Sequence, residues 1–476
     1  MMSEPTQKLR LGALIALVVG SMIGGGIFSL PQNMAASAGA GAVLIGWGIT
    51  AVGMLALAFV FQTLANRKPE LDAGVYAYAK AGFGDYMGFS SAWGYWISAW
   101  LGNVSYFVLL FSTLGYFFPV FGEGNTVAAI VGASVVLWAV HFLVLRGIKE
   151  AAFINLITTV AKVVPLIMFV VITAVAFKMD IFTSDFWGRG NTDLGTVMDQ
   201  VRNMMLVTVW VFIGIEGASI YSARAEKRSD VGKATVIGFI GTLLLLVMVN
   251  VLSMGIMSQP ELAELKNPSM AYVLEHVVGH WGAILISVGL VISLLGALLS
   301  WVLLCAEIMH AAASDHTMPN FLKKISSKGV PTNALWLTNI LVQAFLVITL
   351  FAASTYTSLL YLATSMILIP YFWSAAYAVL IGVKGETYEQ DPGARKKDLI
   401  IGGIALIYAI WLLYAGGFKY ILLSALLYAP GALLFAKAKR EQNLQVFTAI
   451  EKVIVVVTVL GAAFAAYGLY DGFLTL

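Results

Sequence analysis

Two stretches decide the fold of this chain: Gly20-Ser21-Met22-Ile23-Gly24-Gly25-Gly26-Ile27-Phe28 and Phe212-Ile213-Gly214-Ile215-Glu216-Gly217-Ala218-Ser219. Each places helix-breaking glycines in the middle of an apolar segment of membrane length. In hydrocarbon every backbone N–H and C=O needs a protein partner, so such a break is tolerated only where it is buried or lines a cavity. Two breaks at corresponding places in two halves of a chain indicate a binding site near the membrane midplane, as in secondary transporters.

The composition is that of an integral membrane protein. Of its 476 residues 60% are hydrophobic and 11% charged, whereas soluble domains carry about a quarter charged residues. Apolar runs long enough for a ~30 Å hydrocarbon core recur along the whole chain. We therefore predict an all-α polytopic membrane protein with thirteen spans, at about 11–37, 40–64, 85–118, 124–145, 153–177, 200–222, 232–257, 281–313, 332–352, 355–383, 398–416, 418–436 and 449–472.

The distribution of lysine and arginine predicts the orientation of these spans. Alternate loops are basic, for example around Arg67 and Lys68, and cytoplasmic loops carry this excess in membrane proteins. The N-terminus is therefore expected in the cytoplasm, and an odd number of spans places the C-terminus outside. The net charge of +3 follows from this topology, so no nucleic-acid partner is expected.

The loops are too short to hold a soluble catalytic domain, so function must reside in the helical bundle. Spans one to five and six to ten each begin with a glycine-interrupted helix, which is the pattern of an inverted five-plus-five repeat. We predict a transport core at 1–383, with its halves at about 11–177 and 200–383, followed by accessory helices eleven to thirteen at 384–476.

Consecutive glycines from Gly24 to Gly26 allow an unwound backbone that frees several N–H groups at the start of the next half-helix. Such a terminus attracts a carboxylate through its partial positive charge and direct hydrogen bonds. The alternative is close packing of small residues between helices.

Two ionisable residues lie deep within predicted spans, where charges are costly and usually serve a pathway. Glu216 is flanked by glycines in the sixth span and could titrate, pair with a cationic substrate or act as a gate; a carboxyl group satisfied by neighbouring helices is the alternative. Lys162 in the fifth span could be a protonation site or a fixed ammonium in the place of a coupling cation.

Aromatic side chains in the bundle, notably Trp210 and Trp301, could hold a cationic group by cation–π attraction, or they could be ordinary core or belt residues. His141, His310 and His316 fall near predicted cytoplasmic helix ends and are expected to be solvated or interfacial. Cys305 has no partner for a disulfide and is expected to pack. No metal or cofactor motif is present.

The motifs resemble those of the amino acid/polyamine/organocation superfamily, and within it the basic amino acid/polyamine antiporter family. The resemblance covers about residues 8–440. Gly20 to Pro31, followed by Gln32-Asn33, is similar to the unwound first helix of that family, and Trp210-Val211-Phe212-Ile213-Gly214-Ile215-Glu216 to its sixth-helix motif. Ser300-Trp301 and the stretch from Tyr95 to Asn103 resemble its eighth and third helices. The implied fold is the five-plus-five inverted repeat with discontinuous helices one and six, known as LeuT-like.

The resemblance also implies roles for individual residues. The substrate carboxylate would meet the N–H groups of Gly24, Gly25 and Gly26, and its amino group the carbonyls near Ile23 and Ile213. Its cationic side chain would stack on Trp301. Trp210, Tyr95, Tyr371 and Glu216 would form gates, and Asn103 would recognise the side chain.

The chain also departs from the arginine/agmatine exchangers of this family. Ser21, Tyr106 and Ala363 stand where those exchangers have asparagine, methionine and serine. Lys162 resembles a fifth-helix lysine of proton-coupled relatives. With the added thirteenth span, these features are most similar to bacterial arginine/ornithine antiporters of the inner membrane, while histidine/histamine and lysine/cadaverine exchange remain open.

We therefore predict a secondary transporter, not an enzyme, that exchanges cationic amino acids by alternating access. A proton-coupled symporter of cationic amino acids is the alternative, and an antiporter-like subunit of a respiratory proton pump a more remote one. The expected partners are small cationic amino acids or amines and membrane lipid, and a homodimer is left open.

Overall fold

The computed structural model describes residues 10–71, 74–147, 152–216, 225–351 and 355–474. Within these ranges the chain is built from helices, and no strand is present. The α-helices are α1 (Leu11–Met22), α2 (Leu30–Ala35), α3 (Ala40–Arg67), α4 (Val75–Phe83), α5 (Asp85–Phe117), α6 (Val127–Leu145), α7 (Ala152–Ala176), α8 (Met179–Ser184), α9 (Val197–Trp210), α11 (Arg228–Ser253), α12 (Gln259–Ala263), α13 (Ser269–Val278), α14 (His280–Ser314), α15 (Thr332–Ile348), α16 (Thr355–Lys384), α17 (Pro392–Ala415), α18 (Gly417–Glu441) and α19 (Ala449–Asp471).

An all-α polytopic membrane fold is confirmed. Ten of the described helices are long and apolar enough to cross a membrane, or eleven if α1 and the helical segment Gly26–Ala35 form one bent span. The predicted fifth and sixth spans coincide with α7 and α9. α7 has 25 residues, of which the apolar stretch Ala161–Ala176 is described with its side chains, and the described part of the sixth span, α9, has 14 residues. The predicted end of the sixth span, 217–222, lies outside the described residues. The count of thirteen therefore stays a prediction.

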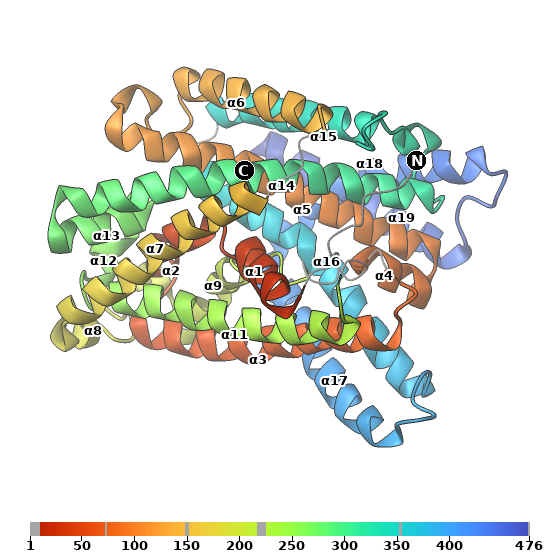
Figure 1. The fold of residues 1–476 in the computed structure, drawn as a ribbon, viewed down its shortest axis with the longest axis horizontal. Coiled ribbons are helices and arrows are strands. Elements are labelled where there is room, and N and C mark those ends of the chain that lie inside the picture. The colour runs from red at the N-terminus through yellow and green to blue at the C-terminus, as the bar shows by residue number, and fades with distance from the viewer. Residues whose placement is uncertain (1–9, 72–73, 148–151, 217–224, 352–354, 475–476) are drawn as a thin grey trace.

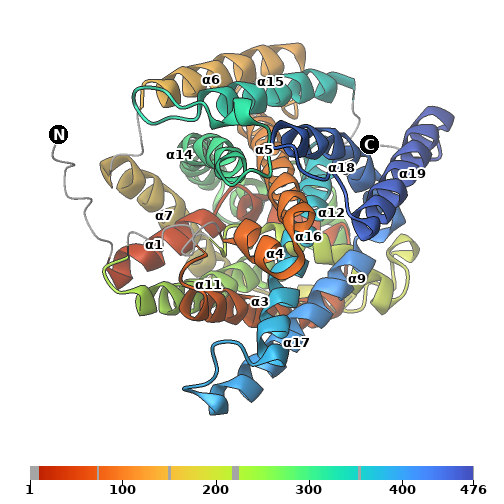
Figure 2. The ribbon, with the colours of Figure 1, turned by 90° about the vertical axis from the view of Figure 1, so that its right-hand side faces the viewer.

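The long helices pack around a central pair. α5 and α14 run through the middle of the bundle, with α6 and α15 along one side and α3 and α11 along the opposite side (Figures 1 and 2). α1 packs on α11 and lies near α7 at one side of the bundle (Figure 2), where its first part is partly exposed. α5 is buried along almost its whole length, as expected for a helix that is surrounded by protein on every side.

The C-terminal helices lie on the outside of this arrangement. α17 packs on α3 and α16, α18 packs on α5 and α16, and α19 has its principal contact with α18 at the edge of the bundle (Figure 2). α17 approaches α3 closely because Gly53 has no side chain: a Cβ there would lie 2.1 Å from the ring of Tyr408.

Basic side chains gather at one end of the bundle, which we call the basic end. It includes the C-terminus of α3, α4, the N-terminus of α5 and the C-terminus of α18. Here Arg67 Nε donates to Asp398 at 2.9 Å and Lys68 Nζ to Glu386 at 3.1 Å. Lys80 Nζ bonds Asp315 at 2.7 Å, and Lys439 pairs with Asp85. These pairs connect helices that lie far apart in the sequence.

One expectation about the histidines was wrong. His141 is fully buried in α6, where Asn339 of α15 lies 2.8 Å from its Nδ1 atom and the ring packs on Trp336. Its position one turn before the end of α6 suggested solvent, but α15 covers that face of the helix. Packing between helices, which the position along one helix does not reveal, removed the ring from solvent.

Candidate functional site

The first quoted stretch forms a break between two helices. α1 ends at Met22, residues Ile23 to Gly25 belong to no helix, a 3₁₀ turn covers Gly26–Ser29, and α2 follows. The two helical parts are bent by 42° relative to each other. The glycines are required here by close approach. A Cβ at Gly24 would lie 2.1 Å from the Tyr106 hydroxyl, and one at Gly26 would lie 2.7 Å from the Trp210 indole nitrogen.

The second quoted stretch breaks the chain after α9. This helix ends at Trp210 and residues 211–216 form turns. Gly214 adopts φ +107°, a conformation that other residues rarely reach. The two breaks touch each other: Ser21 Oγ lies 2.9 Å from the Gly214 carbonyl oxygen, and a Cβ on Gly214 would lie 2.8 Å from the Ser21 carbonyl. The Gly214 carbonyl of the second break is therefore satisfied inside the protein, as hydrocarbon requires.

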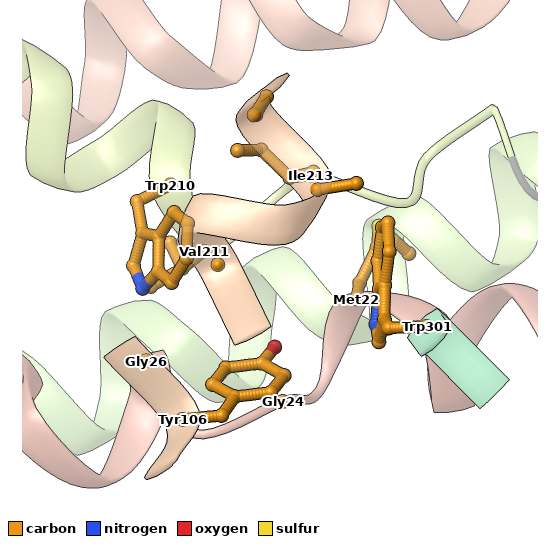
Figure 3. A pocket seen from close by; sticks show the side chains of 11 residues that line it. Met22, Gly24, Gly26, Tyr106, Trp210, Val211, Ile213 and Trp301 are labelled. Atoms are coloured by element: carbon orange, nitrogen blue, oxygen red, sulfur yellow. The ribbon is translucent and has the colours of Figure 1, made fainter. Parts of the chain in front are cut away.

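A small cavity lies at this junction. It has a volume of about 20 Å³ and is lined by Met22, Gly24, Gly26, Ser98, Ala99, Gly102, Tyr106, Trp210, Val211, Ile213 and Trp301. The indoles of Trp210 and Trp301 stand on opposite sides, with the Tyr106 ring between them (Figure 3). A space of this size has room for about one water molecule. An amino acid the size of arginine therefore requires the lining helices to move apart.

Several of the predicted site residues meet around this cavity. Gly24, Gly26, Tyr106, Trp210, Ile213 and Trp301 all line it. Gly25 lies behind them, where a Cβ would meet Leu109 at 2.7 Å, and Ile23 is buried beside them. Ser21 reaches the second break, as described above. These positions come from α5, α14 and both breaks, so the cavity depends on four separate parts of the chain.

Asn103 and Ala363 do not line the cavity in this conformation. Asn103 is fully buried and its Nδ2 lies 3.7 Å from Cys305 Sγ, while its Oδ1 has no hydrogen-bond partner among the described residues. One residue along an α-helix is a rotation of about 100°, so Asn103 faces α14 when Gly102 faces the cavity. Ala363 is fully buried within α16.

Glu216 is the centre of a hydrogen-bonded group on the side of the cavity that faces the basic end. The Tyr95 hydroxyl donates to its Oε1 at 2.7 Å and the Tyr371 hydroxyl donates to its Oε2 at 2.8 Å. All three side chains are about 99% buried. Tyr95 lies one helical turn before Ala99 in α5, on the side of the basic end. The group thus joins α5, α16 and the second break into a layer between the cavity and that end.

Lys162 joins α7 to the first break. Its Nζ donates to the carbonyl oxygen of Gly20 at 3.0 Å, and the side chain is 6% exposed. An ammonium group at the end of an interrupted helix meets the partial negative charge of free carbonyls. This geometry suits a cation that holds α1 against α7 close to the cavity.

The opposite end is covered by α12 and α13. Gln259 Nε2 donates to the Ala35 carbonyl at 2.7 Å, and Gln32 Nε2 donates to the Ala263 carbonyl at 3.1 Å. The Ser269 hydroxyl accepts from the Gln32 N–H at 3.1 Å. These bonds hold the α12–α13 segment on α2, while the Trp210 indole lies against Gly26. The cavity is thereby confined from this side as well.

Five lining residues were not among the predicted site residues: Met22, Ser98, Ala99, Gly102 and Val211. A signal for three positions on α5 was present, because Ser98, Gly102 and Tyr106 recur every four residues and so share one helix face. Two of these are small, which leaves space beside the aromatic ring. The described residues contain no group of His, Cys, Asp or Glu arranged to hold a metal ion.

The fold and this site define a polytopic α-helical membrane transporter. The profile of the family described as "Amino acid permease" matches residues 9–459. The chain is 78% identical over the full length of both proteins to an arginine/ornithine antiporter of Pseudomonas aeruginosa. It is 47% identical to a putative arginine/ornithine antiporter of Escherichia coli, over 92% of this chain and 93% of the other, and 45% identical to an L-lysine transport protein of Corynebacterium glutamicum, over 99% and 97%. The chain belongs to the amino acid permease family of the amino acid/polyamine/organocation superfamily, among the basic amino acid antiporters, and it is not an enzyme.

Proposed function

We propose that this protein exchanges arginine for ornithine across a bacterial cytoplasmic membrane. The observation that carries the proposal is the identity of 78% along the whole length of the arginine/ornithine antiporter of Pseudomonas aeruginosa. Both amino acids carry one net positive charge at neutral pH. Their exchange is therefore charge-neutral, and a gradient of one suffices to drive the other.

The geometry of the site supports a division of labour. We assign the substrate carboxylate to the N–H groups of the Gly24–Gly26 turn, where a new helical segment begins, and the α-amino group to carbonyls near Ile23 and Ile213. The cationic side chain stacks on Trp301, and Trp210 closes the site by lying against Gly26. Asn103 and Ala363 are assigned to side-chain recognition in the opened site.

The group formed by Glu216, Tyr95 and Tyr371 is proposed as the gate toward the basic end. Opening it requires two hydroxyl–carboxylate bonds to break, and a cationic substrate can replace them as the partner of the carboxylate. Alternating access then consists of breaking either this group or the contacts of Trp210 and the α12–α13 segment, but not both together.

The decisive experiment measures uptake of labelled arginine into proteoliposomes preloaded with ornithine, agmatine, lysine, cadaverine, histamine or buffer, without any ion gradient. We expect ornithine loading to give rapid uptake and buffer loading to give none. Uptake into buffer-loaded vesicles that depends on an imposed pH gradient would replace the antiporter with a proton symporter.

Lysine is the second candidate substrate, because the relative from Corynebacterium glutamicum is an L-lysine transport protein. Lysine loading in the same experiment tests it directly. Equal exchange with lysine and ornithine would show a site that recognises the cationic amino acid class as a whole.

Lys162 is proposed as a permanent cation that stabilises the α1–α7 contact through the Gly20 carbonyl. Lys162→Met is then expected to lower turnover while the ratio of arginine to ornithine uptake stays unchanged. Lys397→Met, at an exposed lysine of α17, is the matched control. Normal uptake by Lys162→Met would refute this assignment.

We also propose the membrane arrangement. The basic end faces the cytoplasm, following the distribution of lysine and arginine, with the N-terminus on that side and the C-terminus outside. Residues 1–383 form the transport core as an inverted repeat, and 384–476 form an accessory unit. Whether two copies associate is tested by the mass of the purified protein in mild detergent.

A further inference from the structure

A polar contact between Asn103 and Cys305 lies beside the candidate site, and the function of its thiol is still to be explained. Asn103 Nδ2 donates to Cys305 Sγ at 3.7 Å, from α5 to α14 across 202 residues of sequence. Both side chains are fully buried. Cys305 is the only cysteine of the chain. Asn103 therefore directs its amide at a thiol and does not line the cavity.

The amide of Asn103 is only half paired. Its Oδ1 atom has no hydrogen-bond partner among the described residues, although the carbonyl oxygen of an asparagine can accept two hydrogen bonds. A buried acceptor without a partner carries a free-energy cost. The thiol that holds the other end of the amide is a weak acceptor. The contact is therefore easily broken, and a ligand that donates a hydrogen bond to Oδ1 would remove the cost.

Both residues adjoin the walls of the cavity. Gly102, the neighbour of Asn103, lines the cavity, and a Cβ on it would lie 3.3 Å from the Trp210 ring. Cys305 follows the lining residue Trp301 by four positions, which is about one turn of α14. When the cavity enlarges to admit an amino acid, rotation of the Asn103 side chain can carry its amide from the thiol to the space beside Trp301.

From this geometry we propose that Cys305 is a positioning residue for substrate recognition. Its thiol holds the Asn103 amide outside the cavity while the site is empty. Asn103 then releases the thiol and accepts a hydrogen bond from the cationic side chain of the substrate. The guanidinium group of arginine carries five N–H donors and suits the unpaired Oδ1 atom. This inference rests on the proposed role of Asn103 in recognition and adds that the thiol competes with the substrate for the amide.

The first test uses the S–H stretching band in the infrared spectrum of the purified protein, with arginine binding measured by calorimetry on the same sample. Because the chain holds one cysteine, the band reports Cys305 alone. We expect bound arginine to shift the band, since the thiol loses its N–H donor. Asn103→Ala is expected to shift it in the same direction without arginine and to abolish the response to arginine. A band that bound arginine leaves unchanged would overturn the proposal.

The second test measures KM and the maximal rate of arginine uptake into ornithine-loaded proteoliposomes. Cys305→Ala removes the competing acceptor and is expected to lower KM about two- to fivefold, as the loss of one weak hydrogen bond permits. Asn103→Ala is expected to raise KM, and in that background Cys305→Ala should have no further effect on KM. A merely structural role of the thiol would lower the maximal rate without lowering KM.

Ser287→Ala is the matched control for Cys305→Ala. It also removes one heavy atom from a fully buried side chain of α14, about 27 Å along the helix from Cys305. KM is expected to stay unchanged in this variant, and thermal unfolding of all variants measures folding.

The outcomes separate this inference from the proposed exchange. An unchanged or raised KM in Cys305→Ala would overturn the positioning role, and a raised KM in Asn103→Ala would still support the assignment of Asn103. No effect of Asn103→Ala on KM would overturn that assignment and the positioning role together. Absence of ornithine-driven uptake by the unmodified protein would refute the proposed exchange, whereas the infrared test needs only binding and would still decide the role of the thiol.

Discussion

The contact between Gly24 and Tyr106 offers the most direct test of the candidate site. A Cβ at Gly24 would lie 2.1 Å from the Tyr106 hydroxyl and 3.1 Å from Cζ. Ordinary contact begins at 3.4 Å, so Gly24→Ala requires a displacement of 3.4 − 2.1 = 1.3 Å against the hydroxyl. In the double variant with Tyr106→Phe, only 3.4 − 3.1 = 0.3 Å remains against the ring carbon.

Overpacking of this kind costs about 1–3 kcal/mol, which corresponds to roughly a five- to 150-fold change in an equilibrium. Since the cost falls on the closed conformation described here, Gly24→Ala is expected to slow arginine exchange by about that factor. Tyr106→Phe removes the clashing atom, so the double variant is expected to exchange faster than Gly24→Ala alone. The two substitutions should therefore be strongly non-additive.

The assay is the initial rate of labelled arginine uptake into ornithine-loaded proteoliposomes at equal protein content. Gly12→Ala is the matched control, because Gly12 lies in α1, the helix that leads into this break, and a Cβ there has no neighbour within 4 Å. The reasoning is refuted if Gly24→Ala exchanges as fast as Gly12→Ala, or if Tyr106→Phe and Gly24→Ala reduce the rate additively.

Three further predictions test other parts of the structure. Tyr95→Phe and Tyr371→Phe each remove one hydrogen bond to the Glu216 carboxylate, a loss of about 1.5–3 kcal/mol. Each should change the exchange rate about tenfold or more in the uptake assay. Tyr467→Phe, at an exposed tyrosine of α19, is the control and should have no effect. Gly53→Ala should lower the thermal unfolding temperature, because its Cβ would lie 2.1 Å from the Tyr408 ring, whereas Gly48→Ala meets nothing within 4 Å and should not. The hydrogen bond from Lys68 lowers the pKa of Glu386 below its usual value of 4.5. This pair therefore stabilises the segment between α16 and α17 above that pH, and its contribution is lost as the pH falls below it. Hydrogen-exchange protection at 385–391 should decline with acidification, and Lys68→Met should remove this pH dependence.

The sequence by itself determined the class of protein. Apolar runs of membrane length require α-helices, because helices satisfy their own backbone in hydrocarbon. The glycines at Gly24–Gly26 and Gly214 located both interruptions, since a break at membrane depth leaves a local signal in the residues that form it. The aromatic and charged residues that meet at the site, such as Trp210 and Glu216, were also recognised as out of place in ordinary spans.

Only the tertiary structure decided which of these residues meet. Tyr95 and Tyr371 converge on Glu216 from positions 121 and 155 residues away, and Ser21 touches Gly214 across 193 residues. Local patterns carry no information about such distances, because they depend on how the helices rotate and pack. For the same reason Asn103 faces Cys305 and not the cavity, and α15 buries His141. Periodicity fixes which residues share a helix face, whereas packing alone decides what that face touches.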